Sequence, residues 1–303
     1  MKTHIQPLPE LLLQNIIRDA LLEDFGTGGD ITSLATISAD LNDSFVAIAR
    51  EDGVISGVDI ASKVFKTADS QLEVEVLKAD GTGVKAGEPV LRVSGSARNI
   101  LSAERVALNF IGRMSGIASL TAMMQSACVP HRARVAATRK TTPGFRMIEK
   151  YAVRCGGGLP HRMRLDDAVM IKDNHIAANN GDIVKTLTAA REYAGHTIKI
   201  EVEVDNLSQY KIVQDCGLAD IILLDNMSCA DMRHAVQNNP CGAVLEASGN
   251  VTLQTISDIA ATGVDVISIG ALTHSAPNFD IGLDSRSIVQ EAYRDGVKTA
   301  STL

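Results

Sequence analysis

Tryptophan is absent from the 303-residue sequence, and aromatic residues make up only 3% of it. The formal net charge is −7 and the pI is about 5.5. Such a chain has few aromatic rings on which bases could stack and no overall positive charge to attract a phosphate backbone. We therefore expect no nucleic-acid partner.

Long apolar runs are also missing. None approaches the about 20 residues needed to cross a bilayer. Prolines and polar residues interrupt the N-terminal stretch MKTHIQPLPELLLQNIIRDALLEDFG before a signal-peptide core could form. We therefore expect no membrane partner. The stretch predicts instead an amphipathic helix, with Leu12, Ile16, Ile17, Ala20 and Leu21 on its apolar side.

Cysteine is scarce and unpatterned. The five cysteines are Cys128, Cys155, Cys216, Cys229 and Cys241. They form no CxxC pair, and no histidine follows at the spacing of a zinc finger. This pattern excludes a disulfide framework and a structural zinc site, and it predicts a location in the reducing cytoplasm.

Positive charge is concentrated in one part of this acidic chain. Residues 131–172 contain ten Lys or Arg residues against three Asp or Glu, a local charge of +7 that leaves −14 for the remainder. Within this segment, the stretch ATRKTTPGFR leads from an apolar run directly into Arg139 and Lys140. A basic run is most often a solvated face, so its position on the secondary structure has to decide between that explanation and an anion site.

Strands and helices alternate from about residue 132 onward. The short apolar, β-branched runs are RVAAT, AVMIK, IKIEVEV, DIILLD, GAVLEAS and DVISIG, and helical patterns separate them. Such alternation predicts a parallel sheet covered by helices. We count about six units, fewer than the eight of a complete barrel. The fold class is therefore α/β, an incomplete α/β barrel of about six parallel strands, preceded by a small α+β domain in the first ~100 residues.

Polar or glycine-rich residues follow every predicted strand. This is the carboxyl edge, where parallel α/β proteins place their active sites. The residues concerned are Thr138, Arg139 and Lys140 after the first strand, Lys172 after the second, Glu201 and Glu203 on the third, Asp225 after the fourth, Ser248, Gly249 and Asn250 after the fifth, and Gly270, Ala271 and Leu272 after the sixth.

Each group also has an ordinary structural explanation. Lys172 would be a common strand-end lysine, and Ser248 to Asn250 would be simple turn formers. Glu201 and Glu203 would be edge-strand charges, although carboxylates on a strand between apolar strands require a cation or a metal ion. Six coincidences at one edge favour a pocket with an anion-binding cluster, a carboxylate pair suited to Mg²⁺, and a glycine-rich phosphate cradle.

These motifs together resemble the quinolinate phosphoribosyltransferase family, the decarboxylating pyrophosphorylases of NAD biosynthesis. The matching strings are GDITS, SAERVALN, TRKTTPG, GGG followed by HR, IKDNH, EVEVDNL, LLDN and SGN, in this order along nearly the whole chain. The chain departs from the usual family pattern at Pro160 and Arg164.

The resemblance implies the reaction and the partners. Quinolinate and phosphoribosyl pyrophosphate would react with Mg²⁺ to give nicotinate mononucleotide, pyrophosphate and CO₂ in a cytoplasmic homodimer or a higher oligomer. It also implies an N-terminal sandwich domain (1–110), to which the tail 280–303 returns, and a barrel domain (111–279). Arg105 would reach into the neighbouring subunit's site.

The resemblance also assigns roles within the pocket. Arg139, His161, Arg162 and Lys172 would hold the two carboxylates of quinolinate. Lys140 would face the pyrophosphate. Glu203 and Asp225, with Glu201 nearby, would face the ribose hydroxyls and Mg²⁺, and the loops at 248–250 and 270–272 would hold the 5′-phosphate. Lys140, Lys172, Glu203 and Asp225 are the expected catalytic residues, and Thr138 completes the binding set.

Three other functions share parts of this pattern. A nicotinate phosphoribosyltransferase would take a monocarboxylate, for which the excess of cations is not needed. A Schiff-base aldolase would use Lys172 as its nucleophile. A non-catalytic sensor would bind phosphoribosyl pyrophosphate without turnover. The sequence contains no GxSxG elbow, which agrees with a mechanism that needs no covalent nucleophile.

Overall fold

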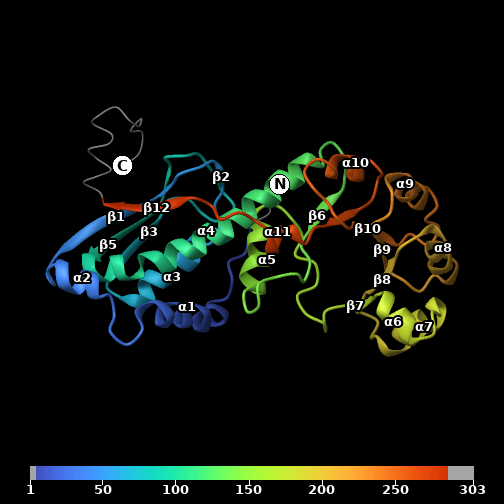
Figure 1. Cartoon of the computed structure of the whole chain (residues 1–303), viewed down its shortest axis with the longest axis horizontal. Coiled ribbons are helices and arrows are strands. Elements are labelled where there is room, and N and C mark those ends of the chain that lie inside the picture. The colour runs from blue at the N-terminus through green and yellow to red at the C-terminus, as the bar shows by residue number, and fades with distance from the viewer. Residues whose placement is uncertain (1–4, 286–303) are drawn as a thin grey trace. The chain divides into compact units, whose positions relative to one another are not determined.

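The computed structural model describes residues 5–285, and its chain divides into two compact units (Figure 1). Among the described residues, unit one contains 5–120, 154–156 and 276–285, and unit two contains 121–153 and 157–275. The predicted boundary after residue 110 falls inside a continuous helix, α4 (Ala97–Ala127), and the predicted domain limits stay predictions.

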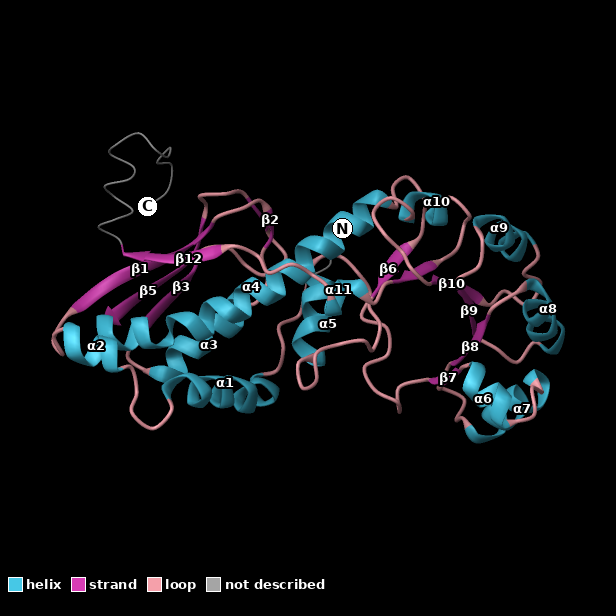
Figure 2. Ribbon diagram, in the orientation of Figure 1, coloured by secondary structure: helices cyan, strands magenta, loops and turns pink. Residues whose placement is uncertain are grey.

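Unit one is built on an antiparallel sheet with the strand order β12-β1-β5-β3. Helices gather on one side of this sheet (Figure 2). The strands are β1 (Asn42–Ala49), β3 (Glu73–Val76), β5 (Pro89–Ser96) and β12 (Ile281–Ser285), with a separate pair formed by β2 (Gly53–Val54) and β4 (Gly83–Val84). The helices are α1 (Glu10–Phe25), α2 (Ile31–Thr36), α3 (Val58–Ala68) and the first part of α4.

Strand β12 comes from the far end of the chain. It pairs with β1, where Phe45 lies opposite Ser285 and Ala49 lies opposite Ile281. The rest of the segment 280–303 that we expected to return here, residues 286–303, lies outside the described residues.

Helix α1 is amphipathic, but its apolar side differs from the prediction in two positions, Leu12 and Leu13. Leu13, Ile17 and Leu21 are buried at four-residue spacing, whereas Leu12 is 55% exposed. The prediction was wrong for Leu12 because this residue lies about 100° around the helix from Leu13, at the margin of the buried stripe.

Helix α4 is the one described helix that is long and apolar enough to cross a membrane by length and composition alone. The sequence pattern predicts a helix from about residue 98 to 126, which α4 confirms, but no apolar run of the length of a membrane span. However, 67% of its most apolar window is buried inside the protein, and a packed core helix meets the same criterion.

Unit two contains the predicted parallel sheet of six strands. The order is β6-β11-β10-β9-β8-β7, and all five strand pairs are parallel. Its edges are β6 and β7, so the barrel is incomplete, as predicted. The strands are β6 (Arg134–Ala136), β7 (Val169–Ile171), β8 (Ile200–Val204), β9 (Ile221–Asp225), β10 (Val244–Ser248) and β11 (Val266–Ser268).

Helices alternate with these strands, and α6 to α10 lie along the outer side of the strand row (Figure 2). Side-chain caps begin several of them: Asp182 accepts from the N–H of Lys185 at the start of α7, and Asn206 accepts from Gln209 at the start of α8. The helices are α5 (Arg146–Cys155), α6 (Asp173–Ala178), α7 (Ile183–Tyr193), α8 (Leu207–Cys216), α9 (Cys229–Gln237), α10 (Ile256–Ala260) and α11 (Ala271–His274).

Candidate active site

A pocket of about 790 Å³ lies at the carboxyl ends of the strands of unit two. It collects residues from every strand end that the sequence analysis identified. The predicted residues that line it are Thr138, Arg139, Lys140, His161, Arg162, Lys172, Glu203, Asp225, Ser248, Gly249, Asn250, Gly270 and Ala271.

Three predicted site residues do not line this pocket. Leu272 is fully buried in the short helix α11. Glu201 is 1% exposed and contacts His161. Arg105 is an exposed residue of α4 in unit one.

Two arginines on one side of the pocket have hydrogen-bonding capacity left over. The Nε atoms of Arg139 and Arg162 are buried and have no hydrogen-bond partner among the described residues. Arg162 donates its other nitrogens to the Ala168 carbonyl at 3.2 Å and to Met170 Sδ at 3.1 Å. Burial, followed by the charge of Arg139, lowers the pKa of Arg162. Two half-buried guanidinium groups that repel each other and each keep a buried, unpartnered Nε are suited to binding an anion.

Lys150 fixes the loop that presents His161 and Arg162. The residue is 1% exposed, and its ammonium donates to the backbone carbonyl of Pro160 and, at 2.6 Å, to that of Arg162. His161 between them has a left-handed backbone with φ of 52°. Burial, together with Arg146 and Arg139, lowers the pKa of Lys150 to about 8.

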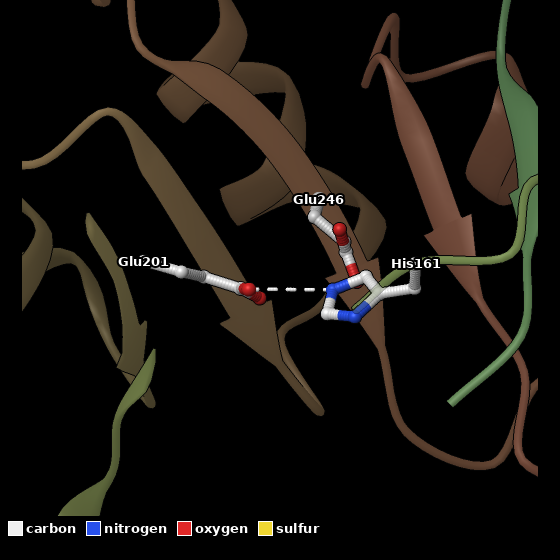
Figure 3. Close-up of side chains that lie close together, drawn as sticks. All are labelled: His161, Glu201 and Glu246. Atoms are coloured by element: carbon white, nitrogen blue, oxygen red, sulfur yellow. Dashed lines mark ion pairs between the residues drawn. The ribbon is translucent and has the colours of Figure 1, made fainter. Parts of the chain in front are cut away.

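His161 lies between two buried carboxylates (Figure 3). Its Nε2 is 3.3 Å from Glu201 Oε2 and 3.5 Å from Glu246 Oε1. Burial opposes the charged imidazole, but the hydrogen bond to Glu201 and the charge of Glu246 outweigh it and raise the pKa of His161. Burial, together with the charge of Glu201, raises the pKa of Glu246 to about 7.

The same three ligand atoms lie within 4.8 Å of one another, a spacing that a metal ion also allows. We assign the cluster to hydrogen bonding, because His161 already supplies a proton between the carboxylates and the positive charge of Lys150 acts on both His161 and Glu246. Placing another cation beside these groups would add like-charge repulsion.

Glu203 and Asp225 form the carboxylate pair that faces the pocket from neighbouring strands β8 and β9. Glu203 pairs with the ammonium of Lys172. Asp225 accepts hydrogen bonds from the Ser248 hydroxyl and, at 2.8 Å, from the Asn226 amide. Both side chains offer hard oxygen donors to the pocket, which is the donor set that Mg²⁺ prefers.

The loop after β10 requires glycine at one position. Gly249 has φ of 99°, and a Cβ there would lie 2.1 Å from Asn226 Oδ1. The neighbouring Asn250 is also left-handed, with φ of 45°. Backbone N–H groups in such a turn are open to an anion. At Gly270 a Cβ would lie 3.0 Å from Lys140 Cδ, so this glycine lets the basic loop approach β11 closely.

The sequence analysis missed several residues of the site. Glu246 was interpreted as part of the apolar run GAVLEAS, although a carboxylate on an inner strand carries the same signal that identified Glu201. His274 also lines the pocket; Asn226 lines it too, although its place after Asp225 at the end of the fourth predicted strand was recognised in the sequence. Lys150 was counted only as one of many cations, and nothing local in the sequence indicates that its ammonium binds carbonyls ten and twelve residues later.

Family models match both parts of the chain. The quinolinate phosphoribosyl transferase N-terminal domain matches residues 30–115, and the C-terminal domain of the same enzyme matches residues 117–284. The chain belongs to the quinolinate phosphoribosyltransferase family. It is accordingly a pentosyltransferase, and the predicted family, fold class and activity class are confirmed.

Individual relatives agree over nearly their whole length. The probable nicotinate-nucleotide pyrophosphorylase [carboxylating] of Bacillus subtilis is 40% identical over 274 residues, which is 90% of this chain and 93% of the relative. The nicotinate-nucleotide pyrophosphorylase [carboxylating] of Mycobacterium leprae is 43% identical over 279 residues, 89% and 96% of the two chains. The crystal structure of NadC from Streptococcus pyogenes superposes with a TM-score of 0.88 at 38% identity, covering 92% of this chain and 99% of NadC.

Proposed function

We propose that this phosphoribosyltransferase transfers the phosphoribosyl group from phosphoribosyl pyrophosphate to quinolinate and releases pyrophosphate and CO₂, so that nicotinate mononucleotide is formed. The observation that carries this proposal is the pair of buried, unpartnered Nε atoms of Arg139 and Arg162, beside His161. A dicarboxylate supplies two anionic groups to this basic side, whereas a monocarboxylate supplies one.

The pocket divides into regions that fit the parts of the two substrates. Arg139, Arg162, His161 and Lys172 bind the quinolinate carboxylates, as planar guanidinium groups favour bidentate carboxylates. The turns at 248–250 and 270–271 offer backbone N–H groups to the 5′-phosphate. Lys140, on the loop beside Gly270, faces the departing pyrophosphate.

Catalysis in this arrangement depends on charge and position. When pyrophosphate leaves, the ribosyl carbon develops positive charge, which the carboxylates of Glu203 and Asp225 stabilise, while Lys140 stabilises the departing anion. Holding the pyridine nitrogen against C1′ lowers the activation barrier further, because the step becomes effectively unimolecular. A Schiff base at Lys172 is not required, and this lysine is paired with Glu203.

Glu203 and Asp225 are the residues that would hold Mg²⁺. When bound, Mg²⁺ would neutralise charge on the pyrophosphate. The test is an Asp225→Asn variant together with chelation by EDTA. We expect turnover to fall strongly in both cases while quinolinate binding in the absence of the second substrate stays near normal. Undiminished activity in EDTA would remove the metal from the mechanism.

We further propose that the enzyme works as a cytosolic homodimer in which Arg105 completes the neighbouring subunit's site. What supports this is the family resemblance of SAERVALN together with the exposure of Arg105 on α4. The proposed reaction, which is argued from the unpartnered Nε atoms of Arg139 and Arg162, does not depend on this part of the proposal.

Incubation with quinolinate, phosphoribosyl pyrophosphate and Mg²⁺ tests the reaction. Nicotinate mononucleotide, pyrophosphate and CO₂ are expected in equal amounts. Turnover of nicotinate in place of quinolinate, without CO₂, would favour the monocarboxylate enzyme. Trapping of Lys172 by borohydride with a carbonyl substrate would favour an aldolase, and binding of phosphoribosyl pyrophosphate without any product would favour a sensor.

A further inference from the structure

The proposed reaction contains a proton transfer that none of the roles above supplies. After ribosyl transfer the pyridine nitrogen is cationic, and the adjacent carboxylate on C2 leaves as CO₂. The electron pair of the broken bond stays on C2, and a proton must form the new C2–H bond. The site therefore needs an acid near the quinolinate carboxylates whose pKa is close to the working pH.

Most cations of the pocket are unsuited to this step. The guanidinium groups of Arg139 and Arg162 do not release protons at ordinary pH. Lys172 is paired with Glu203. His274 lies on the side of the glycine-rich turns, where its Nδ1 is 2.6 Å from the Ser275 hydroxyl and its ring stands against Gly270.

His161 has the geometry that an acid needs. Its Nε2 is turned toward Glu201 of β8 and Glu246 of β10, and Figure 3 shows its other ring nitrogen, Nδ1, turned away from both carboxylates. The side chain lines the pocket and belongs to the same basic side as Arg139 and Arg162. With Nε2 held by the carboxylates, Nδ1–H is the proton that can reach a bound ligand.

We propose that His161 is the general acid of the decarboxylation and delivers its Nδ1 proton to C2 as CO₂ departs. The C2–carboxylate bond breaks, its electron pair takes the proton, and the positive charge of the ring nitrogen is retained in the product. His161 becomes neutral and regains a proton from water when the product leaves. The inference rests on the proposed function.

The buried carboxylates explain why the imidazole is charged before the step. Glu201 and Glu246 are almost fully buried, each has one buried oxygen without a hydrogen bond among the described residues, and both form an ion pair with His161 Nε2. Burial and the positive charge of Lys150 on α5 both disfavour the charged imidazole of His161. The two carboxylates outweigh these effects, and the pKa of His161 is raised. CO₂ held in the pocket can recombine with C2, so protonation commits the reaction.

A single-turnover experiment with His161→Asn separates the two chemical steps. Asparagine tolerates the left-handed backbone at this position, and its amide keeps a hydrogen-bond donor that cannot release a proton. In the wild type, pyrophosphate and CO₂ should appear together. In the variant we expect pyrophosphate release within about tenfold of wild type and CO₂ release slowed about 100-fold, with quinolinate mononucleotide accumulating. His196→Asn, at an exposed site, is the matched control.

Equal slowing of both products, or no slowing of either, would overturn the proposal while leaving the wild-type reaction intact. A wild type that makes no nicotinate mononucleotide would instead refute the proposed function. Metal analysis of the purified enzyme adds a further criterion: a stoichiometric ion that disappears in His161→Asn would show that the cluster is a metal site and overturn the proton role.

Glu246→Gln provides a second variant that keeps the shape of the site. Removing one carboxylate lowers the affinity of His161 for its proton. The pH above which the rate of CO₂ release declines should therefore be lower in the variant than in the wild type. Pyrophosphate release should show no such movement. A merely structural role for Glu246 would reduce both rates without shifting the pH profile, and that result would count against the acid role of His161.

Discussion

Lys150 and Arg162 are joined by a partly buried hydrogen bond, in which the ammonium of the lysine donates to the backbone carbonyl of the arginine at 2.6 Å. The same ammonium also binds the carbonyl of Pro160, so one side chain fixes both ends of the segment that carries His161. The position of two substrate-binding residues therefore depends on a lysine that does not line the pocket.

Lys150→Met should loosen that segment. Two partly buried carbonyls lose their donor, and we expect the free energy of unfolding to fall by about 1–3 kcal/mol. The KM for quinolinate should rise at least about tenfold, while the KM for phosphoribosyl pyrophosphate stays near wild type. Steady-state kinetics and urea unfolding measure these effects. Lys185→Met, at an exposed site on α7, is the control, and equal rises in both KM values would contradict a local role.

Arg162→Ala tests the carboxylate site directly. Because the guanidinium is partly buried and its Nε is unpartnered, its loss should weaken quinolinate binding by about 2–4 kcal/mol. Binding of phosphoribosyl pyrophosphate should change much less. Titration calorimetry with each substrate separates the two, and Arg164→Ala, at an exposed arginine paired with Asp166, should leave both unchanged. Equal losses for both substrates would indicate a structural role.

The buried Glu246 should make stability depend on pH. Its pKa is raised from 4.5 to about 7, so between these values the folded protein binds more protons than the unfolded chain. The free energy of unfolding must then fall as pH rises from about 5 to 7, by about 1–3 kcal/mol from this residue. His161, whose pKa is also raised, acts in the same direction at higher pH.

Urea unfolding at several pH values checks this dependence. Glu246→Gln should gain stability relative to wild type as pH rises toward 7, whereas the exposed Glu192→Gln should show a constant difference. A Glu246→Gln difference that does not vary with pH would mean that the carboxyl group titrates normally.

Subunit mixing tests whether Arg105 acts in the neighbouring subunit. Inactive Arg105→Ala and Lys172→Ala proteins, once dissociated and reassociated, should form heterodimers in which one site carries both lesions and the other carries none. Two-fold symmetry then predicts recovery of up to about half the wild-type activity per heterodimer. Verified subunit exchange without recovery would place Arg105 outside the partner's site.

The sequence predicted the parallel sheet well because its signal is local. Runs such as DIILLD and GAVLEAS are apolar throughout most of their length, and the strands β9 and β10 lie within them. The carboxyl ends of parallel strands meet at one edge of the sheet, so strand order alone predicts that Lys172, Glu203 and Asp225 lie together, as they do in the pocket. We expected carboxylates on inner strands to pair with cations. Glu203 pairs with Lys172, and Glu201 pairs with His161.

What could not be predicted depends on contacts across the sheet. Glu201 and Glu246 lie on β8 and β10, which are separated by β9, and only the fold places them on either side of one imidazole. Nothing in either strand specifies the loop that delivers His161. The anchoring of this loop by Lys150 is likewise a tertiary effect.

The pairing of β12 with β1 has a consequence for synthesis. The strand at 42–49 leaves the ribosome early, but its partner at 281–285 emerges only after all of unit two has been made. Until then one edge of β1 offers unpaired N–H and C=O groups, the kind of edge from which nascent chains aggregate. The N-terminal sheet is thus completed last, and truncation before residue 281 should yield a chain that depends on chaperones even though its catalytic unit is entire.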